Sequence, residues 1–218
     1  MIFYLTQTRT LTTLAIDELI YWLNIIGTIA FAISGALLAG RKNMDIVGFV
    51  FIATVTAVGG GTVRDLILDQ PVFWVQDPSI LYVCALSALL TFWITFNSKI
   101  LIGTLNWFDA MGLALFTVIG AQKAIDVGAP YTVAVLMGIM SASFGGIIRD
   151  VICNEVPVLL QREIYITASL VGATALVIGH NLAGDNTLVT IAAFLLCFAI
   201  RSLGIIFGLS LPVRKGAN

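Results

Sequence analysis

Charged residues are scarce in this sequence. Asp, Glu, Lys and Arg together make up 11 % of its 218 residues, whereas soluble domains carry about 25 %. Hydrophobic residues make up 59 % of the chain, and the mean hydropathy is +1.03. A surface with so little charge suits lipid better than water, so the composition predicts an integral membrane protein.

The sequence is also poor in residues that build metal, disulfide or nucleic-acid sites. Cys84, Cys153 and Cys197 are far apart in apolar surroundings, which predicts small buried side chains and neither a disulfide framework nor a zinc site. The single histidine, His180, has no companion for metal binding. Basic runs such as Arg41-Lys42 are only two residues long and the net charge is -1, which speaks against nucleic acid as a partner. Because no catalytic grouping or phosphate loop is present, we expect no enzyme and no cofactor.

Seven apolar segments lie between polar stretches. Each is close to the roughly 20 residues that a helix needs to cross a bilayer, and none alternates as barrel strands do. Helices satisfy their own backbone in lipid, so we predict an all-α polytopic membrane protein with seven transmembrane helices. The first segment is expected to act as an uncleaved insertion signal, because no cleavable signal peptide precedes it. The segments are residues 19–40, 46–68, 80–96, 105–124, 131–152, 164–179 and 188–209.

The distribution of Lys and Arg predicts the orientation of the chain. Basic residues favour the inner side of a membrane. With the N-terminus outside and the C-terminus inside, more of them fall on the inner side. The inner set is Arg41, Lys42, Lys99, Arg149, Arg162, Arg214 and Lys215, and the outer set is Arg9, Arg64 and Lys123.

The first half of the chain aligns with the second half at a constant offset. The matches without a gap include Gly60-Gly61 on Gly145-Gly146 and Arg64-Asp65 on Arg149-Asp150. Each unit holds three spans, an odd number, so the second unit must be inverted relative to the first. Such inverted repeats place their site at the interface of the repeats. We therefore predict units at 19–97 and 105–180, with a seventh helix at 187–209 outside the repeat.

The glycines of the second helix in each unit have two interpretations. Small side chains at every fourth position allow close helix packing. A run of three glycines also weakens a helix and favours a kink or break, which would expose carbonyl oxygens that can coordinate monovalent cations. The expected kinks are Gly59, Gly60, Gly61, Gly145 and Gly146, and the expected carbonyl ligands of a metal ion are Gly59, Gly60, Ser143 and Phe144.

The Arg–Asp pairs are the second unusual feature of these helices. Arg64-Asp65 and Arg149-Asp150 lie within or at the ends of apolar spans, where a charge costs about 2.5–3.5 kcal/mol. A single Arg could extend to the headgroups. The occurrence of the pair in both units instead indicates two related pairs near the two mouths of a pathway.

Lys123 distinguishes the two halves. Its counterpart is Leu38, so it does not belong to the symmetric part of the sequence. A Lys at this place either reaches the headgroups or gates a pathway. Asp109 and Arg201 are further charges inside the predicted spans, with no partner that the sequence identifies.

The chain resembles the prokaryotic trimeric intracellular cation channels. The resemblance rests on seven spans, the repeat, Gly-Gly-Gly-Thr-Val-Arg-Asp at 59–65 and Phe-Gly-Gly-Ile-Ile-Arg-Asp at 144–150. It implies a homotrimer in a bacterial or archaeal inner membrane, with a hydrophilic pore for K⁺ and Na⁺ in each protomer. It also implies second and fifth helices kinked at glycines, a gate at Lys123 and lipid as a further partner.

Two functions therefore remain open. The first is a passive monovalent cation channel, with K⁺ or Na⁺ as the permeating or bound ion. The second is a carrier for glycine or another small zwitterion, because broken helices can offer N–H groups to a carboxylate and carbonyls to an ammonium. A purely structural membrane subunit would account for the small-residue stripes but not for the duplicated Arg–Asp pairs.

Overall fold

The protein is all-helical throughout the part of the chain that a computed structural model describes, residues 2–94, 98–161 and 163–210. For residues 2–17 and 98–103 only the backbone is described. The predicted all-α membrane fold is thereby confirmed. The elements are α1 Ile2–Arg41, α2 Ile46–Ile67, α3 Phe73–Gln76, α4 Ser79–Ile94, α5 Ser98–Asp126, α6 Tyr131–Ile152, the 3-10 turn η1 Val158–Leu160, α7 Ile166–Ala183 and α8 Thr187–Phe207.

Six helices are long and apolar enough to cross a membrane. They are α2, α6, α7, α8 and the apolar parts of α1 and α5, Glu18–Arg41 and Thr104–Asp126. The third predicted span is represented by α4, which is apolar but has only 16 residues. Its expected end at residues 95–97 lies outside the described residues. The number of seven spans is therefore not confirmed.

Two helix starts differ from the sequence-based boundaries by more than two residues. α1 begins at Ile2, although its apolar segment starts near residue 19, and α5 begins at Ser98 instead of residue 105. Hydropathy marks where a helix enters lipid, and a helix can continue beyond that point because polar side chains do not interrupt it. The predicted bounds of α2 and α6 agree with the structure to within one residue.

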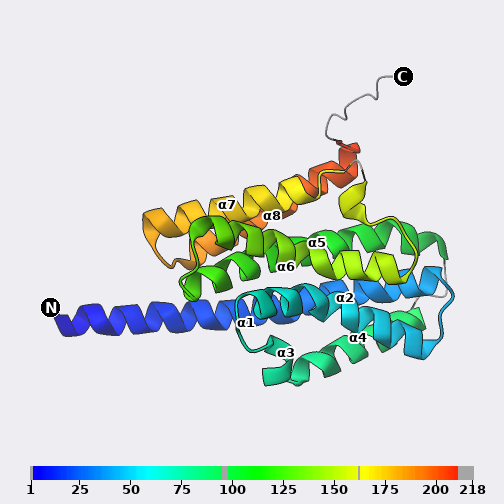
Figure 1. The fold of residues 1–218 in the computed structure, drawn as a ribbon, viewed down its shortest axis with the longest axis horizontal. Coiled ribbons are helices and arrows are strands. Elements are labelled where there is room, and N and C mark those ends of the chain that lie inside the picture. Colours follow the sequence, from blue (N-terminus) through cyan, green and yellow to red (C-terminus); the bar gives the residue numbers. More distant parts are fainter. Residues whose placement is uncertain (1, 95–97, 162, 211–218) are drawn as a thin grey trace.

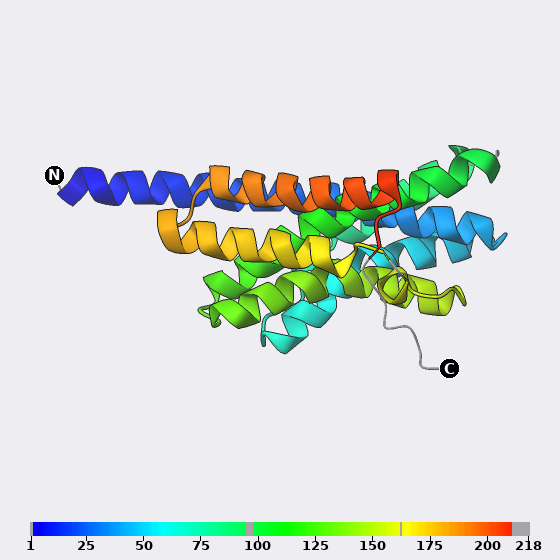
Figure 2. The ribbon, with the colours of Figure 1, turned by 90° about the horizontal axis from the view of Figure 1, so that it is seen from above.

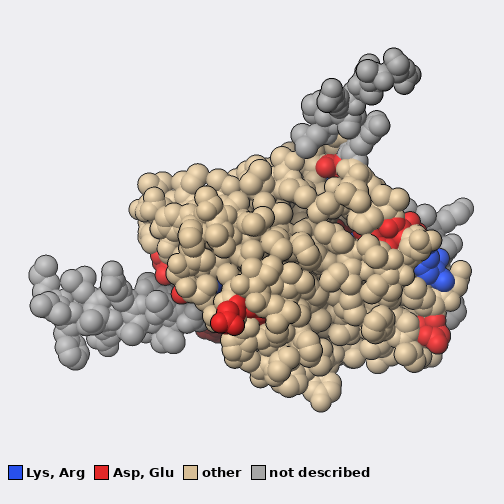
Figure 3. Space-filling view, in the orientation of Figure 1, with Lys and Arg blue, Asp and Glu red and all other residues tan. Residues whose placement is uncertain are grey.

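The helices form two groups of three that share a central contact (Figures 1 and 2). α1, α2 and α4 pack against one another, and α5, α6 and α7 do the same. The groups meet where α1 packs on α5 and α2 on α6, while α8 covers α5 and α7. The visible face of the molecule is largely uncharged, with charges gathered toward its two ends (Figure 3), as lipid contact requires.

Contacts between the groups come in equivalent pairs. Gly27 of α1 lies against the ring of Phe116, and Gly112 of α5 lies against the ring of Phe31. The two rings stack with centroids 5.3 Å apart and an angle of 8° between their planes. Since the repeat alignment pairs the two glycines with each other and the two rings with each other, α1 and α5 contribute the same surface to this contact.

The crossing of α2 and α6 is equally matched. A methyl group added at Gly60 would overlap with the carbonyl oxygen of Ser141, and one added at Gly145 would overlap with that of Thr56. Glycine is required at both positions because the two backbones approach so closely. The packing interpretation therefore applies to Gly60 and Gly145.

The expected break in α2 and α6 is absent. Each helix runs without interruption, through Gly59–Gly61 in α2 and through residues 143–146 in α6. Neighbouring helices and the ring of Phe73 cover the glycines, so the backbone keeps its helical hydrogen bonds in surroundings that offer no alternative. A smooth kink and ion coordination by the carbonyls of Gly59, Gly60, Ser143 and Phe144 stay predictions.

The remaining sequence-based expectations have mixed outcomes. Cys84, Cys153 and Cys197 are buried free thiols, as expected. The orientation with the N-terminus outside stays a prediction, and Arg64 and Arg149 do not inform it because they are buried inside the protein. The side chains of Arg9, Lys99, Arg162, Arg214 and Lys215 lie outside the described residues.

Candidate functional site

The two Arg–Asp pairs have the same local geometry. Arg64 Nε donates to Asp65 Oδ1 over 2.8 Å, and Arg149 Nε donates to Asp150 Oδ1 over the same distance. All four side chains are buried in the last turns of α2 and α6. They therefore do not extend to the headgroups, since each cation is paired inside the protein.

The chain after each helix folds back onto the Asp. Asp69 and Asn154 have φ angles of 52° and 53°, which turn the backbone at equivalent places. The next segment then donates a backbone N–H to the second carboxylate oxygen, from Phe73 to Asp65 over 3.0 Å and from Val158 to Asp150 over 3.2 Å. Both oxygens of each carboxylate are thus held by hydrogen bonds, which fixes the orientation of the side chain.

The first pair belongs to a cluster with one excess positive charge. Lys123 Nζ lies 2.9 Å from Asp65 Oδ1, so Asp65 binds two cations. Arg64 Nη1 also donates to the hydroxyl of Ser141 on α6 over 3.3 Å. Asp65 has no exposed surface, whereas the Lys123 side chain is 28 % exposed. The lysine is therefore the accessible member of this outer cluster, which consists of Arg64, Asp65, Lys123 and Ser141.

The second pair belongs to a cluster with one excess negative charge. Arg149 Nη1 lies 2.7 Å from Asp109 Oδ1 and also donates to the hydroxyl of Ser34. Arg149 therefore serves two carboxylates, those of Asp109 and Asp150. The other oxygen of Asp109, Oδ2, is buried and forms no short hydrogen bond among the described residues, and the hydroxyl of Tyr165 faces this carboxylate. We call Ser34, Asp109, Arg149 and Asp150 the inner cluster, after the predicted orientation.

These clusters lie at the C-terminal ends of α2 and α6. α2 and α6 run in opposite directions, so the ends that carry Asp65 and Asp150 point apart (Figure 1). The close crossing at Gly60 and Gly145 lies between them. The structure thus aligns two buried charge clusters along one pair of crossed helices.

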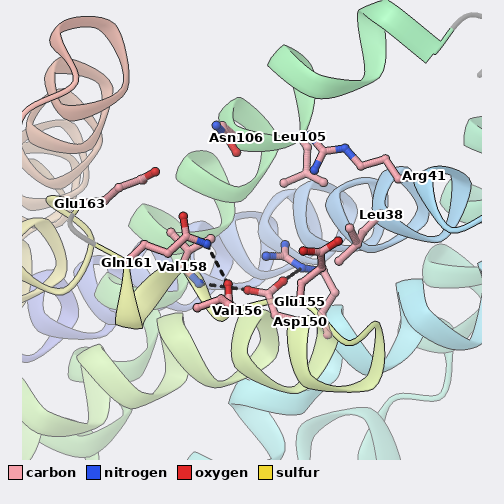
Figure 4. Close-up of a pocket in the computed structure, with 11 residues that line it drawn as sticks. Leu38, Arg41, Leu105, Asn106, Asp150, Glu155, Val156, Val158, Gln161 and Glu163 are labelled. Atoms are coloured by element: carbon pink, nitrogen blue, oxygen red, sulfur yellow. Dashed lines mark hydrogen bonds and ion pairs between the residues drawn. The ribbon is translucent and has the colours of Figure 1, made fainter.

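A polar cavity of about 210 Å³ opens at the inner cluster (Figure 4). Two ion pairs involve acidic residues that line it: Lys42 Nζ lies 2.8 Å from Glu155 Oε1, and Arg201 Nη1 lies 2.7 Å from Glu163 Oε2. The lining residues are Leu38, Arg41, Leu105, Asn106, Arg149, Asp150, Glu155, Val156, Val158, Gln161 and Glu163.

Arg201 attaches α8 to the segment before α7. Besides its ion pair with Glu163, it donates to the carbonyl oxygen of Ile164 over 3.4 Å and lies 5.0 Å above the ring centroid of Tyr165. The partners of Arg201 and Asp109 could not be found from sequence, because each lies on another helix or loop. No signal in the sequence marked Ser34 or Ser141 as partners of the arginines.

The remaining candidate residue is His180, in the last turn of α7. Its Nδ1 lies 3.0 Å from Asp185 Oδ1. Among the described residues, no group of three or more His, Cys, Asp and Glu side chains is arranged to hold a metal ion.

Comparison with known proteins places the chain in a family. A family model described as "Glycine transporter" matches residues 21–95 and 106–181, and these two stretches start at the same offset as the aligned repeats. The UPF0126 inner membrane protein YadS of Escherichia coli K12 is 48 % identical over 156 residues, which cover 71 % of this chain and 75 % of that protein. The UPF0126 membrane protein YvgT of Bacillus subtilis is 33 % identical over 198 residues, covering 88 % and 95 %.

Solved structures with the same fold are cation channels. The TRIC trimeric intracellular cation channel orthologue from Rhodobacter sphaeroides is 44 % identical, with a TM-score of 0.83, and the match covers 88 % of this chain and 99 % of that one. A prokaryotic TRIC channel in 0.5 M KCl is 30 % identical, with a TM-score of 0.83 and coverage of 89 % and 100 %. These relatives are membrane proteins and channels, not enzymes. The chain belongs to the prokaryotic trimeric intracellular cation (TRIC) channel family.

Proposed function

We propose that this protein is a monovalent cation channel for K⁺ and Na⁺. Its conduction path runs within each protomer along α2 and α6, and three protomers assemble as a homotrimer in the inner membrane. Similarity to solved cation channels, at up to 44 % identity over 88 % of the chain, supports the class of function and the trimer.

The observation that carries the proposal is the pair of buried charge clusters, one at the C-terminal end of α2 and one at the C-terminal end of α6. Ionisable groups within a membrane protein are costly and commonly mark an ion pathway. Here the two Arg–Asp pairs lie on the two helices that cross at the centre of the molecule, and Lys123 and Asp109 reach them from α5. The contacts that recur at equivalent positions of the two halves support an inverted repeat, so that one Arg–Asp pair faces each mouth.

Lys123 is the gate in this proposal. Its ammonium on Asp65 is a tethered cation that occupies the carboxylate which a permeating ion would use. It also gives the outer cluster an excess positive charge, which repels cations. When the partly exposed lysine side chain moves away, Asp65 becomes available and the outer mouth attracts cations.

The test is single-channel recording in planar bilayers with three variants. Lys123→Ala should raise the ratio of open to closed time on the order of tenfold, equivalent to about 1.4 kcal/mol. Asp65→Asn should lower the unitary conductance, because the carboxylate at the outer mouth is lost. Asp69→Asn is the matched control, since it removes the same charge one turn away on an exposed residue whose counterpart is already Asn154.

Unchanged currents in both Lys123→Ala and Asp65→Asn would contradict the assignment of the outer cluster. A purified protein without unitary currents at any voltage would contradict the channel itself.

A carrier for glycine is the second candidate function, favoured by the description of the family model. In each cluster an Arg lies beside an Asp, so a zwitterion could place its carboxylate on the guanidinium and its ammonium on the carboxylate. Saturable glycine uptake into proteoliposomes, in the absence of unitary currents, would support the carrier against the channel.

A further inference from the structure

Equivalent carboxylates in the two halves of the molecule have different partners. Asp65 receives the ammonium of Lys123. The repeat alignment relates Asp65 to Asp150 and Lys123 to Leu38. Leu38 and Asp150 both line the polar cavity of about 210 Å³ (Figure 4). The inner half thus has a cavity between the two residues whose counterparts form an ion pair in the outer half.

The inner cluster has one excess negative charge, which a bound cation would compensate. Arg149 is held by Asp109, Asp150 and Ser34, so one guanidinium faces two carboxylates. The hydroxyl of Tyr165 faces Asp109 but does not offset its charge, and Asp109 Oδ2 is buried and forms no short hydrogen bond among the described residues. A buried carboxylate is expensive unless a positive charge compensates it.

The other acidic residues of the cavity do not change this balance. Glu155 is paired with Lys42, and Glu163 is paired with Arg201. Arg41 also lines the cavity, but its side chain is exposed, whereas the side chains of Asp109 and Arg149 are buried. Asp109 lies one helical turn beyond Leu105 and Asn106, which line the cavity, so its excess charge acts on the space they enclose.

We propose that this cavity binds one partly hydrated monovalent cation against Asp150, in the position that corresponds to the Lys123 ammonium in the outer half. Its volume accommodates an ion with several waters, each of which takes about 30 Å³ in the liquid. A single excess charge suits a monovalent ion, since Ca²⁺ is bound by about 6–8 oxygen ligands and commonly by several carboxylates. The site rests on the proposed function in that it names where a permeating cation pauses.

Leu38→Lys tests the site directly, because it introduces a tethered ammonium where the cation is proposed to lie. Leu38→Met is the matched control, with an unbranched side chain of similar length and no charge. Asp109→Asn is a second variant that removes the excess negative charge and installs the residue of the equivalent position, Asn24. It keeps the test decisive if Leu38→Lys does not fold.

The measurement is the rise in the thermal unfolding temperature of purified protein as KCl replaces N-methyl-D-glucamine chloride at constant ionic strength. The wild type and Leu38→Met should show a saturable rise. Leu38→Lys should lose it, and Asp109→Asn should require at least about tenfold more K⁺, because a full charge near the ion is removed.

A K⁺-dependent rise that persists unchanged in Leu38→Lys and Asp109→Asn would overturn the site, as would its absence in the wild type. This readout needs no current. If the site binds K⁺ as described but bilayers show no unitary conductance, the channel proposal fails and the site stands. If currents are present and K⁺ does not stabilise the wild type, the cation site fails and the channel proposal stands.

Discussion

The crossing of α2 and α6 leaves no room for a methyl group at Gly60. The added carbon would overlap with the carbonyl oxygen of Ser141 and lie 3.0 Å from its carbonyl carbon. Both atoms are backbone, so the helices must separate to relieve the contact. Forced overpacking of this kind costs about 1–3 kcal/mol, while replacing Gly by Ala within a helix returns about 0.5–1 kcal/mol. We expect Gly60→Ala to destabilise the protein by about 1–2 kcal/mol.

Gly59→Ala is the matched control, with the same chemical change one residue earlier. Its added carbon would meet the terminal Cδ1 of Ile148 at 3.0 Å and Gly145 Cα at 3.7 Å. The end of an Ile side chain can move, so Gly59→Ala should be neutral or stabilising by up to about 1 kcal/mol. Thermal unfolding in detergent should separate the two variants by several degrees, on the scale of about 2–4 °C per kcal/mol. Equal unfolding temperatures would refute the packing interpretation and favour the glycines as a hinge.

Three further predictions concern the periphery of the site and the central stack. Arg201→Gln should lower the free energy of unfolding on the order of 2 kcal/mol, because it leaves Glu163 without its partner. This is less than for a fully buried pair, since the Glu163 side chain is 37 % exposed to solvent. Thermal unfolding measures the effect, with Arg201→Lys as the comparison. The hydrogen bond from Lys42, and then its charge, lower the pKa of Glu155. The pair therefore stabilises the folded protein above the ordinary pKa of Glu, and this stabilisation is lost as the pH falls through the lowered pKa. An NMR titration should show that low pKa and its return toward the ordinary value in Lys42→Ala. Phe116→Ala should cost about 3–5 kcal/mol in the same unfolding assay, because it removes one ring of the buried stack.

Helices with clear polar boundaries could be predicted from the sequence to within one residue. α2 was expected at 46–68 and found at Ile46–Ile67, and α6 was expected and found at 131–152. Turns with positive φ at Asp69 and Asn154 end both helices, next to polar sequence that marks the boundary. The alignment of the two repeats also identified which positions of the two halves correspond.

The ion-pair partners could not be predicted, because they depend on packing between distant parts of the chain. Asp109 lies 40 residues from Arg149, and Ser34 lies 115 residues from it. Nothing local marks such a partner. The glycine run has a related explanation: local propensity favours a break at Gly59–Gly61, whereas α2 is continuous there because of its tight contact with α6, and a smooth kink stays a prediction.

The symmetric residues account for the fold, and the asymmetric ones account for what the fold can do. Gly60 and Gly145 give the same close crossing from either side, so they leave both ends of the molecule alike. A cation that met only these shared features would find the same environment at each mouth. Lys123 has Leu38 at the equivalent position of the other half, and Asp109 has Asn24. These two differences give the two ends opposite excess charges. In the proposed channel, the outer mouth would carry its own cation on the Lys123 side chain, whereas the inner mouth would take one from solution, and only the outer mouth could close without the loss of an ion.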